Sequence, residues 1–341
     1  MRIGILTGGG DCPGLNPALR AVVMRAMDFG DECVGVKMGW AGLIENETMP
    51  LTLDTVEDII SRGGTILESS RTNPFKRDED LQATLHNIDE LKLNAIVALG
   101  GEDTLGVTYK LFKLGVQTVG VPKTMDNDLN CTDYTFGFDS AVQIATDAAD
   151  RLRDTARSHR RVMVLEVMGR HAGWVALETG VAGGADWILI PEEPLDIGEM
   201  TDHLRRLRER GKHFGLVVVS EGVEMTEADH STARTDDFGH VILRERGVGE
   251  FVAKEIEERA DIETRLAVLG HIVRGGSPTA FDRMLATRLG IRAVDLVHEG
   301  KFGYMASLTG NQFVGVPLED AVAELKTVPH ALYEEITTLF K

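Results

Sequence analysis

Four acidic residues stand directly after two apolar stretches of the sequence. Glu102 and Asp103 follow an apolar run and a glycine pair, and Asp126 and Asp128 follow the next apolar run. Because open α/β sheets collect ligands at the carboxyl ends of their strands, we expect these side chains to lie together. Carboxylate oxygens suit a hard divalent cation, and a remaining carboxylate can accept a proton. This combination predicts phosphoryl transfer.

Basic side chains recur close to the ends of expected strands in the second half of the chain. They are Arg161, Arg170, Arg265, His271 and Arg274. Guanidinium groups hold phosphate oxygens through two-point contacts, so this group predicts a site for a phosphorylated substrate. The chain has a net charge of −18, so these local cations must overcome an unfavourable overall field.

The first glycine-rich loop, TGGGDCPGLN at 7–16, lies between an expected strand and an expected helix. Asn16 suits the cap of that helix, whose apolar positions, Met27 among them, predict one buried face. A dinucleotide-binding loop would need glycine in place of Pro13, and no Walker lysine follows. The loop either cradles a phosphate with its N–H groups or is a structural turn. Arg71, in a later polar loop, either reaches a phosphate or is solvated.

Composition and charge restrict the class of protein. The chain has 341 residues, 43% hydrophobic and 26% charged, which suits a soluble enzyme with two core-bearing domains. Its 36 basic and 54 acidic residues argue against nucleic acid or an anionic membrane as a partner. Three cysteines in no metal-binding spacing predict free thiols in a reducing cytosol, with Cys12 inert. No run is long enough for a signal peptide or a membrane span, so we expect a cytoplasmic protein.

Apolar runs of strand length alternate with helical segments, which predicts an α/β fold with mostly parallel sheets covered on both faces. Strands are expected at 2–6, 33–37, 95–99, 118–121, 162–166, 187–190, 216–219 and 265–270. Helices are expected at 17–27, 56–61, 80–91, 104–114, 140–155, 174–180, 197–210, 248–259, 281–298 and 318–339. The polar stretch 224–239 is expected to be an exposed insertion loop.

Six motifs in a fixed order give the chain a specific resemblance. They are TGGGDCPGLN (7–16), GGEDT (100–104), PKTMDND (122–128), EVMGRHAGW (166–174), SEG (220–222) and GHIVRGGSP (270–278). With these motifs the sequence resembles the 6-phosphofructokinase family over essentially its full length. A lone GGD-like loop also occurs in NAD kinases, which lack the later motifs.

The resemblance implies two similar three-layer αβα domains with mostly parallel sheets. The first, which would bind the phosphoryl donor and Mg²⁺, comprises residues 1–138 and about 279–311. The second, which would bind fructose 6-phosphate, comprises residues 139–278 and about 312–341. The chain would therefore cross between the domains more than once.

The resemblance also implies the roles of individual residues. Asp126 would accept the proton of the sugar 1-hydroxyl, Glu102 would bind Mg²⁺, and Gly10 would lie against the donor phosphates, with Arg71 beside them. The residues that would hold fructose 6-phosphate are Thr124, Asp126, Met168, Gly169, Arg170, Glu221, His271 and Arg274. Arg161 and Arg265 would reach the substrate of a neighbouring subunit, which implies a homodimer or homotetramer with shared active sites.

Two positions distinguish inorganic diphosphate from ATP as the donor. ATP-using relatives carry Gly where this chain has Asp103, and commonly Gly where it has Lys123. A carboxylate at 103 would repeat the charge of the nucleotide α-phosphate, and like charges about 4 Å apart at a partly buried site cost on the order of 4 kcal/mol. Lys123 offers a compact cation for the diphosphate leaving group. The pair resembles pyrophosphate-dependent phosphofructokinases of the bacterial group that is otherwise similar to the ATP enzymes.

Several alternatives remain open at this point. The runner-up is an ATP-dependent phosphofructokinase in which a shifted loop tolerates Asp103. A kinase that prefers sedoheptulose 7-phosphate and a non-catalytic sugar-phosphate sensor are further options, the sensor being disfavoured by the intact proton acceptor. With diphosphate as donor we expect a reversible reaction. Effector-controlled relatives use two arginines on the first helix, and this chain has Arg20 but Met24, so we expect a non-allosteric enzyme.

Overall fold

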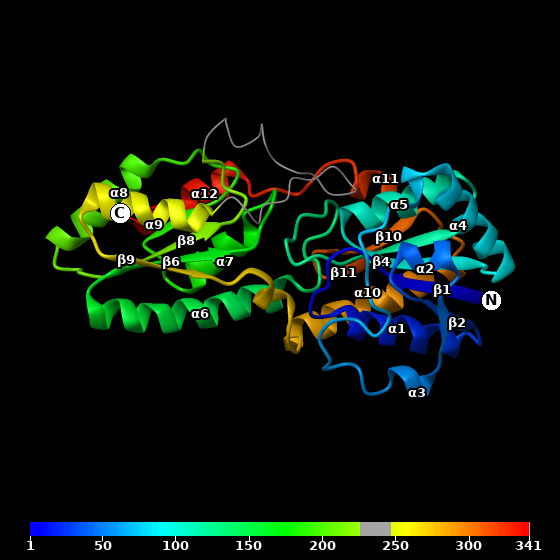
Figure 1. The fold of residues 1–341 in the computed structure, drawn as a ribbon. Helices are drawn as coiled ribbons and strands as arrows, with labels where there is room; N and C mark the ends of the chain where they lie inside the picture. The colour runs from blue at the N-terminus through cyan, green and yellow to red at the C-terminus, as the bar shows by residue number, and fades with distance from the viewer. Residues whose placement is uncertain (226–246, 341) are drawn as a thin grey trace.

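The computed structural model describes residues 1–225 and 247–340, which form two α/β units (Figure 1). The first unit contains a seven-stranded sheet. Its strands, in spatial order, are β11 (Gln312–Pro317), β10 (Tyr304–Thr309), β5 (Thr118–Pro122), β4 (Ala95–Gly100), β1 (Arg2–Thr7), β2 (Glu32–Val36) and β3 (Thr48–Leu51). The strands from β10 to β2 run parallel, and the edge strands β3 and β11 are antiparallel to their neighbours.

Helices cover both faces of this sheet because successive side chains of its inner strands point to opposite sides. Ile3 and Ile5 pack against one pair of helices, and Leu6 packs against helices on the other face. The pair on the first face is α1 (Leu15–Asp28) and α10 (Ala280–His298). The helices on the second face are α2 (Trp40–Glu45), α4 (Asp78–Glu90) and α5 (Glu102–Lys113).

The second unit has a four-stranded sheet that is parallel throughout. Its strands, in spatial order, are β7 (Trp187–Leu189), β8 (Gly215–Ser220), β6 (Val162–Val167) and β9 (Thr264–Val268). Leu165 faces α6 (Phe138–His159) and α7 (Trp174–Ala182), and Val164 faces α8 (Ile197–Glu209) and α9 (Val248–Ala260). Two three-layer α/β units with mostly parallel sheets are therefore present, and the expected fold class is confirmed.

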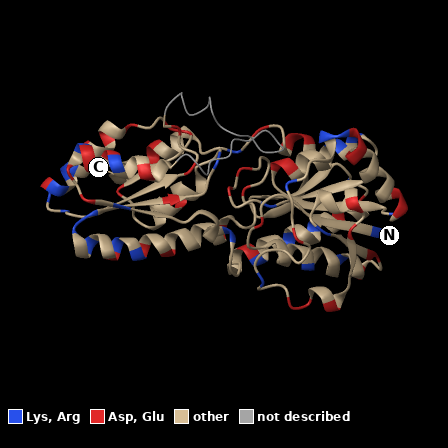
Figure 2. Ribbon diagram, in the orientation of Figure 1, with Lys and Arg blue, Asp and Glu red and all other residues tan. Residues whose placement is uncertain are grey.

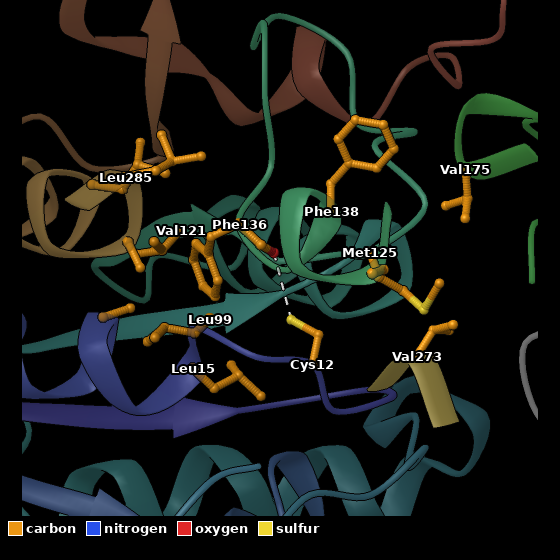
Figure 3. Packing of buried hydrophobic residues seen from close by; sticks show 14 of the residues in the cluster. Cys12, Leu15, Leu99, Val121, Met125, Phe136, Phe138, Val175, Val273 and Leu285 are labelled. Atoms are coloured by element: carbon orange, nitrogen blue, oxygen red, sulfur yellow. Dashed lines mark hydrogen bonds between the residues drawn. The ribbon is translucent and has the colours of Figure 1, made fainter. Parts of the chain in front are cut away.

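A continuous hydrophobic core joins the two units. Figure 3 shows part of this core, with Cys12 of the first loop, Phe136 just before α6, Phe138 at the start of α6 and Val175 of α7. The Cys12 thiol donates a hydrogen bond to the Phe136 carbonyl over 3.5 Å. Because these side chains are fully buried, the loops that lead into both units are held by the same packing.

The start of the first helix differs from the expectation. Asn16 lies inside α1, and the helix is preceded by Gly14, whose φ of 110° lies in the left-handed region. The buried amide of Asn16 donates to the carbonyls of Arg62 and Gly63 and accepts from the Ile66 N–H. Asn16 was therefore wrongly predicted as a cap, because its side chain pairs with a distant loop.

The predicted burial of one apolar side chain on that helix is also wrong. Met27, expected on the buried face of α1, is 43% exposed. The short helix expected at 56–61 is likewise shifted, since α3 comprises Leu53–Val56.

The C-terminal region differs more strongly from the structure that the sequence predicts. The helix expected at 318–339 is two short helices, α11 (Leu318–Ala321) and α12 (His330–Thr337), and residues 304–317 form the unpredicted hairpin β10–β11. Because β11 completes the first sheet, the domain boundary expected near 311 lies too early. The Tyr333 hydroxyl of α12 donates to the Ile188 carbonyl in the second unit, so we propose that the chain crosses between 322 and 329.

Most of the expected insertion loop 224–239 lies outside the described residues. Acidic and basic residues are spread over both units (Figure 2). No helix in the described part of the chain combines the length and the apolar character needed to cross a bilayer.

The other two crossings between the units meet at one buried carboxylate. Asp282, near the start of α10, accepts hydrogen bonds from the Ser140 N–H (2.8 Å) and hydroxyl (2.6 Å) at the start of α6. The Thr279 N–H donates to the same Ser140 hydroxyl over 3.0 Å. Burial raises the pKa of Asp282 to about 6, against the stabilising effect of these hydrogen bonds.

The Ser140 hydroxyl is therefore expected to stabilise the joint. Ser140→Ala removes a donor from a buried carboxylate, which should lower the free energy of unfolding by about 1–3 kcal/mol in chemical denaturation. The matched control is Ser158→Ala on the exposed end of the same helix, which should change it by less than about 0.5 kcal/mol. Equal effects of the two substitutions would contradict this role.

Candidate active site

The acidic residues converge because two parallel strands end side by side. Gly100 at the end of β4 is paired with Pro122 at the end of β5, and the Lys123 N–H continues the ladder to the Gly100 carbonyl. Glu102 and Asp103 form the first turn of α5, where free N–H groups and the helix dipole favour negative charge. The predicted grouping at this edge of the sheet is thus observed.

A cavity of about 130 Å³ opens at this edge. Its walls come from both units, and its side chains are almost all charged or polar. The lining residues are Gly9, Gly10, Arg71, Gly101, Glu102, Asp103, Thr104, Lys123, Thr124, Asp126, Asp128, Met168, Arg170, His171, Glu221 and Arg274. A larger cavity of about 750 Å³ lies between α8 and α12, away from this chemistry.

Lys123 is a buried cation in the wall of the cavity. Its ammonium donates a hydrogen bond of 2.6 Å to the Gly10 carbonyl, and the side chain is 4% exposed. Burial lowers the pKa of Lys123, and the negative charges of Asp128 and Asp126 act in the opposite direction. This contact joins the glycine-rich loop after β1 to the segment after β5.

Asp126 and Asp128 present carboxylate oxygens that lack protein partners. One buried oxygen of each has no hydrogen-bond partner among the described residues. Burial and, after it, the neighbouring charge of Asp126 together raise the pKa of Asp128 to about 7. The Asp126 N–H donates to the Thr124 hydroxyl over 3.1 Å, which fixes the backbone of this segment.

These oxygens fit a hard divalent cation. No three Asp, Glu, His or Cys side chains in the described ranges enclose a metal by themselves. Mg²⁺ does not require such a cage, because proteins commonly bind it through one or two carboxylates together with substrate phosphates. Glu102 and the unpartnered oxygens of Asp126 and Asp128 supply that kind of donor set.

The second unit contributes the opposite wall from the ends of β6 and β8. The Glu221 N–H donates to the Val167 carbonyl, and burial raises the pKa of the Glu221 carboxyl to about 6, with the charge of Asp126 as the next cause. Gly169 has a φ of 149°, and a Cβ there would lie 2.6 Å from the Ser220 hydroxyl. Only glycine suits this turn, which brings Met168 into the cavity.

Arg274 closes the cavity between the two walls. It ends the 3₁₀ helix η4 (Gly270–Arg274), and its guanidinium donates to the Asp11 carbonyl over 3.0 Å. A Cβ on Gly10 would lie 2.6 Å from a nitrogen of that guanidinium. Because Gly10 has no side chain, the Arg274 guanidinium can contact the first glycine-rich loop.

The structure gathers most of the predicted site residues and leaves four outside the cavity. Gly169 forms the turn that brings Met168 into the cavity but does not line the cavity itself. His271 lines an adjoining cavity of about 280 Å³ that shares Met168 and Glu221. Arg161 and Arg265 lie at the opposite ends of β6 and β9. Arg161 is 3.4 Å and Arg265 2.7 Å from the Glu263 carboxylate.

The sequence analysis did not name several lining residues. They are Gly9, Gly101, Thr104 and His171, whereas Asp128 was predicted as one of the four acidic residues. His171 and Thr104 lie within the motifs MGRHAGW and GGEDT, so the motifs themselves could have indicated them.

The cysteines behave as predicted. All three are free, and Cys12 and Cys33 are buried. Burial raises the pKa of the Cys12 thiol to about 12, so the thiolate needed for a nucleophile does not form at neutral pH.

Comparisons with known proteins agree with this geometry. Residues 2–297 match the family model described as Phosphofructokinase. The chain is 54% identical to a protein of Dictyoglomus thermophilum named pyrophosphate–fructose 6-phosphate 1-phosphotransferase, over 100% of this chain and 99% of that protein. It is 49% identical to ATP-dependent 6-phosphofructokinase 3 of Streptomyces coelicolor, over 98% of both chains.

A solved structure supports the fold. The crystal structure of a pyrophosphate-dependent phosphofructokinase from Marinobacter aquaeolei superposes with a TM-score of 0.84 at 21% identity, covering 100% of this chain and 92% of that one. At that identity the likeness concerns the fold alone. From the family model and the full-length relatives, we conclude that this chain belongs to the phosphofructokinase family.

Proposed function

We propose that this protein is a pyrophosphate-dependent 6-phosphofructokinase. It transfers a phosphoryl group from diphosphate to the 1-hydroxyl of fructose 6-phosphate and releases orthophosphate. The observation that carries the proposal is one cavity that contains Asp126, Glu102 and the pair Asp103 and Lys123. Overall sequence identity does not distinguish diphosphate from ATP as the phosphoryl donor. A relative named for diphosphate is 54% identical to this chain, and a relative named for ATP is 49% identical.

Asp103 carries the choice of donor. Its carboxylate stands in the first turn of α5, where a nucleotide phosphate would otherwise benefit from the N–H groups and dipole of the helix. A second negative charge there repels a phosphate by on the order of 4 kcal/mol at about 4 Å. Diphosphate is shorter than the triphosphate chain of ATP and places no further phosphate at this end of the site.

Asp126 is the proton acceptor in this mechanism. Its position at the end of β5 puts it opposite Arg170 and Glu221, which come from the second unit. The sugar hydroxyl loses its proton to Asp126 as its oxygen attacks the phosphoryl group in line. When bound, Mg²⁺ neutralises the negative charge of the donor oxygens, and Glu102 with the oxygens of Asp128 would hold it.

Lys123 and the arginines supply the remaining positive charge. The Lys123 ammonium stabilises the leaving orthophosphate from its place beside the Gly10 carbonyl, and Arg71 binds the donor at the rim. Arg170 and Arg274 with Glu221 and Met168 orient the sugar phosphate. Because the anhydride cleaved and the phosphate ester formed differ little in free energy, the reaction is reversible.

Arg161 and Arg265 serve a second copy of the chain. They lie at the amino-terminal ends of β6 and β9, whereas the cavity lies at the carboxyl ends. The six-residue strand β6 spans about 16 Å, so neither guanidinium belongs to the cavity of its own chain. We therefore infer a cytoplasmic homodimer or homotetramer with shared active sites and, because Met24 replaces an arginine, no allosteric effector.

The first test concerns the donor. With Mg²⁺ and fructose 6-phosphate, diphosphate should support turnover with a kcat/KM roughly 10²- to 10³-fold above that for ATP. Asp103→Gly should raise kcat/KM for ATP at least about tenfold, because it removes the repelling carboxylate. The matched control is Asp78→Gly in the first turn of α4, which should change neither value. Efficient turnover of ATP by the unaltered enzyme would overturn the assignment.

The second test concerns the proton acceptor. Asp126→Asn keeps the size of the side chain but cannot take the proton, so kcat should fall by about 10²- to 10⁴-fold in the same assay. The control is Asp150→Asn on the exposed face of α6, which should keep full activity. An unchanged kcat in Asp126→Asn would show that another group accepts the proton.

A further inference from the structure

The short tail segment 325–328 runs behind the cavity and touches both of its walls. Leu325 forms an antiparallel bridge with Leu129, and the Lys326 N–H donates to the Asp128 carbonyl over 2.8 Å. On its other side, the Lys326 carbonyl accepts a hydrogen bond of 2.9 Å from the Trp174 indole. The main chain of the tail therefore connects the segment after β5 to the start of α7.

The side chain of Lys326 makes three further hydrogen bonds. Its ammonium donates to the Asn127 side-chain oxygen and to the carbonyls of Thr132 and Asp133, each over 2.9 Å. An ammonium has three N–H groups, so all of its donors are used. All three acceptors belong to the segment that begins at Asp126.

That segment has an unusual backbone conformation. Asn127 and Cys131 have φ values of 53° and 60°, a left-handed conformation that asparagine tolerates and that is uncommon for most other residues except glycine. The Asn127 side-chain oxygen also accepts from the Thr135 N–H over 3.1 Å. Asn127 stands between Asp126 and Asp128, so its conformation sets the direction of both carboxylates.

The tail holds the sugar-binding wall as well. The Glu192 carboxylate accepts hydrogen bonds from the Gly173 N–H (2.9 Å) and the Val328 N–H (2.8 Å). Gly173 and Trp174 end the loop that brings Met168 and Arg170 to the cavity. One tail segment thus fixes the position of the acid-bearing segment relative to this loop.

We propose that Lys326 is a positioning residue, which holds Asp126 in register with the sugar-binding loop through Asn127 and Trp174. The inference rests on the proposed function, because it assigns Asp126 the role of proton acceptor. Lys326 is not among the residues that line the cavity. Its effect is on the geometry of the reacting groups, where a misplacement of about 1 Å can cost 100-fold in rate.

Lys326→Met keeps the length of the side chain and removes its three donors. In the steady-state assay with fructose 6-phosphate, kcat should fall by about 10- to 100-fold, with both KM values within about threefold of the parent. Lys301→Met, at a lysine that pairs with exposed Glu299, is the control and should keep full activity. Circular dichroism at the assay temperature shows whether the variant is folded, and a folded Lys326→Met enzyme with unchanged kcat would overturn the proposal.

A double-mutant cycle separates positioning from general loss of structure. If Lys326 acts through Asp126, then Lys326→Met should reduce the residual kcat of Asp126→Asn by less than about threefold. A reduction as large as in the parent enzyme would overturn the proposal. Failure of the donor assignment is a different result, because it appears in the unaltered enzyme, and the cycle can then be run with whichever donor is turned over.

A milder variant covers the case in which Lys326→Met does not fold. Trp174→Phe keeps an aromatic ring at this position, although a smaller one, and removes the indole N–H that binds the Lys326 carbonyl. The value of kcat should fall by about 3- to 10-fold with KM retained. A folded Trp174→Phe enzyme with the parental kcat would overturn the link between the tail and the sugar-binding loop.

Discussion

Electrostatic balance within one small cavity is the constraint on which the rest of the structure depends. Glu102, Asp103, Asp126 and Asp128 bring their carboxylates to one edge of the first sheet. Like charges repel strongly where little water screens them, and the pKa of Asp128 is raised first by burial and then by the charge of Asp126. The buried cation Lys123 offsets part of the negative charge of these carboxylates. A divalent metal bound with its anionic donor would complete the charge balance. We therefore propose that the site binds a ligand that carries metal and phosphate together.

The two-unit architecture explains how these charged side chains are fixed in position while the cavity remains accessible to a ligand. Strands of each sheet end at the cavity, and the aromatic side chains of Phe136 and Phe138 pack the units against each other behind it. Gly10 lets Arg274 touch the first loop, so the cation from the second unit closes over the acidic edge of the first. The hydrogen bonds of Asp282 and Lys326 fix the same joint from two further sides. The contacts that hold the two units together therefore also position the side chains around the cavity.

Much of the site could be predicted because strand ends and motifs are local signals. The apolar runs before Glu102 and Asp126 placed both residues correctly, since neighbouring parallel strands end at one edge. The hairpin β10–β11 was missed although its Gly310–Asn311 turn is a recognisable signal. His271 lines the adjoining cavity rather than the main one, although Arg274 of the same 3₁₀ helix lines the main cavity, and a motif does not reveal such side-chain directions. Lys326 could not be predicted, since its partner Asn127 lies 199 residues away and nothing in either local pattern indicates the pair.

We propose that Asp103 and Lys123 adapt the acidic edge to inorganic diphosphate. The most direct measurement is a crystal structure of the protein with Mg²⁺ and methylenediphosphonate, a diphosphate analogue that is not cleaved. We expect one phosphonate group beside Lys123 and Gly10, the metal on Glu102, and the Asp103 carboxylate undisplaced. An analogue bound elsewhere, or bound only after Asp103 has swung out of the cavity, would contradict this proposal.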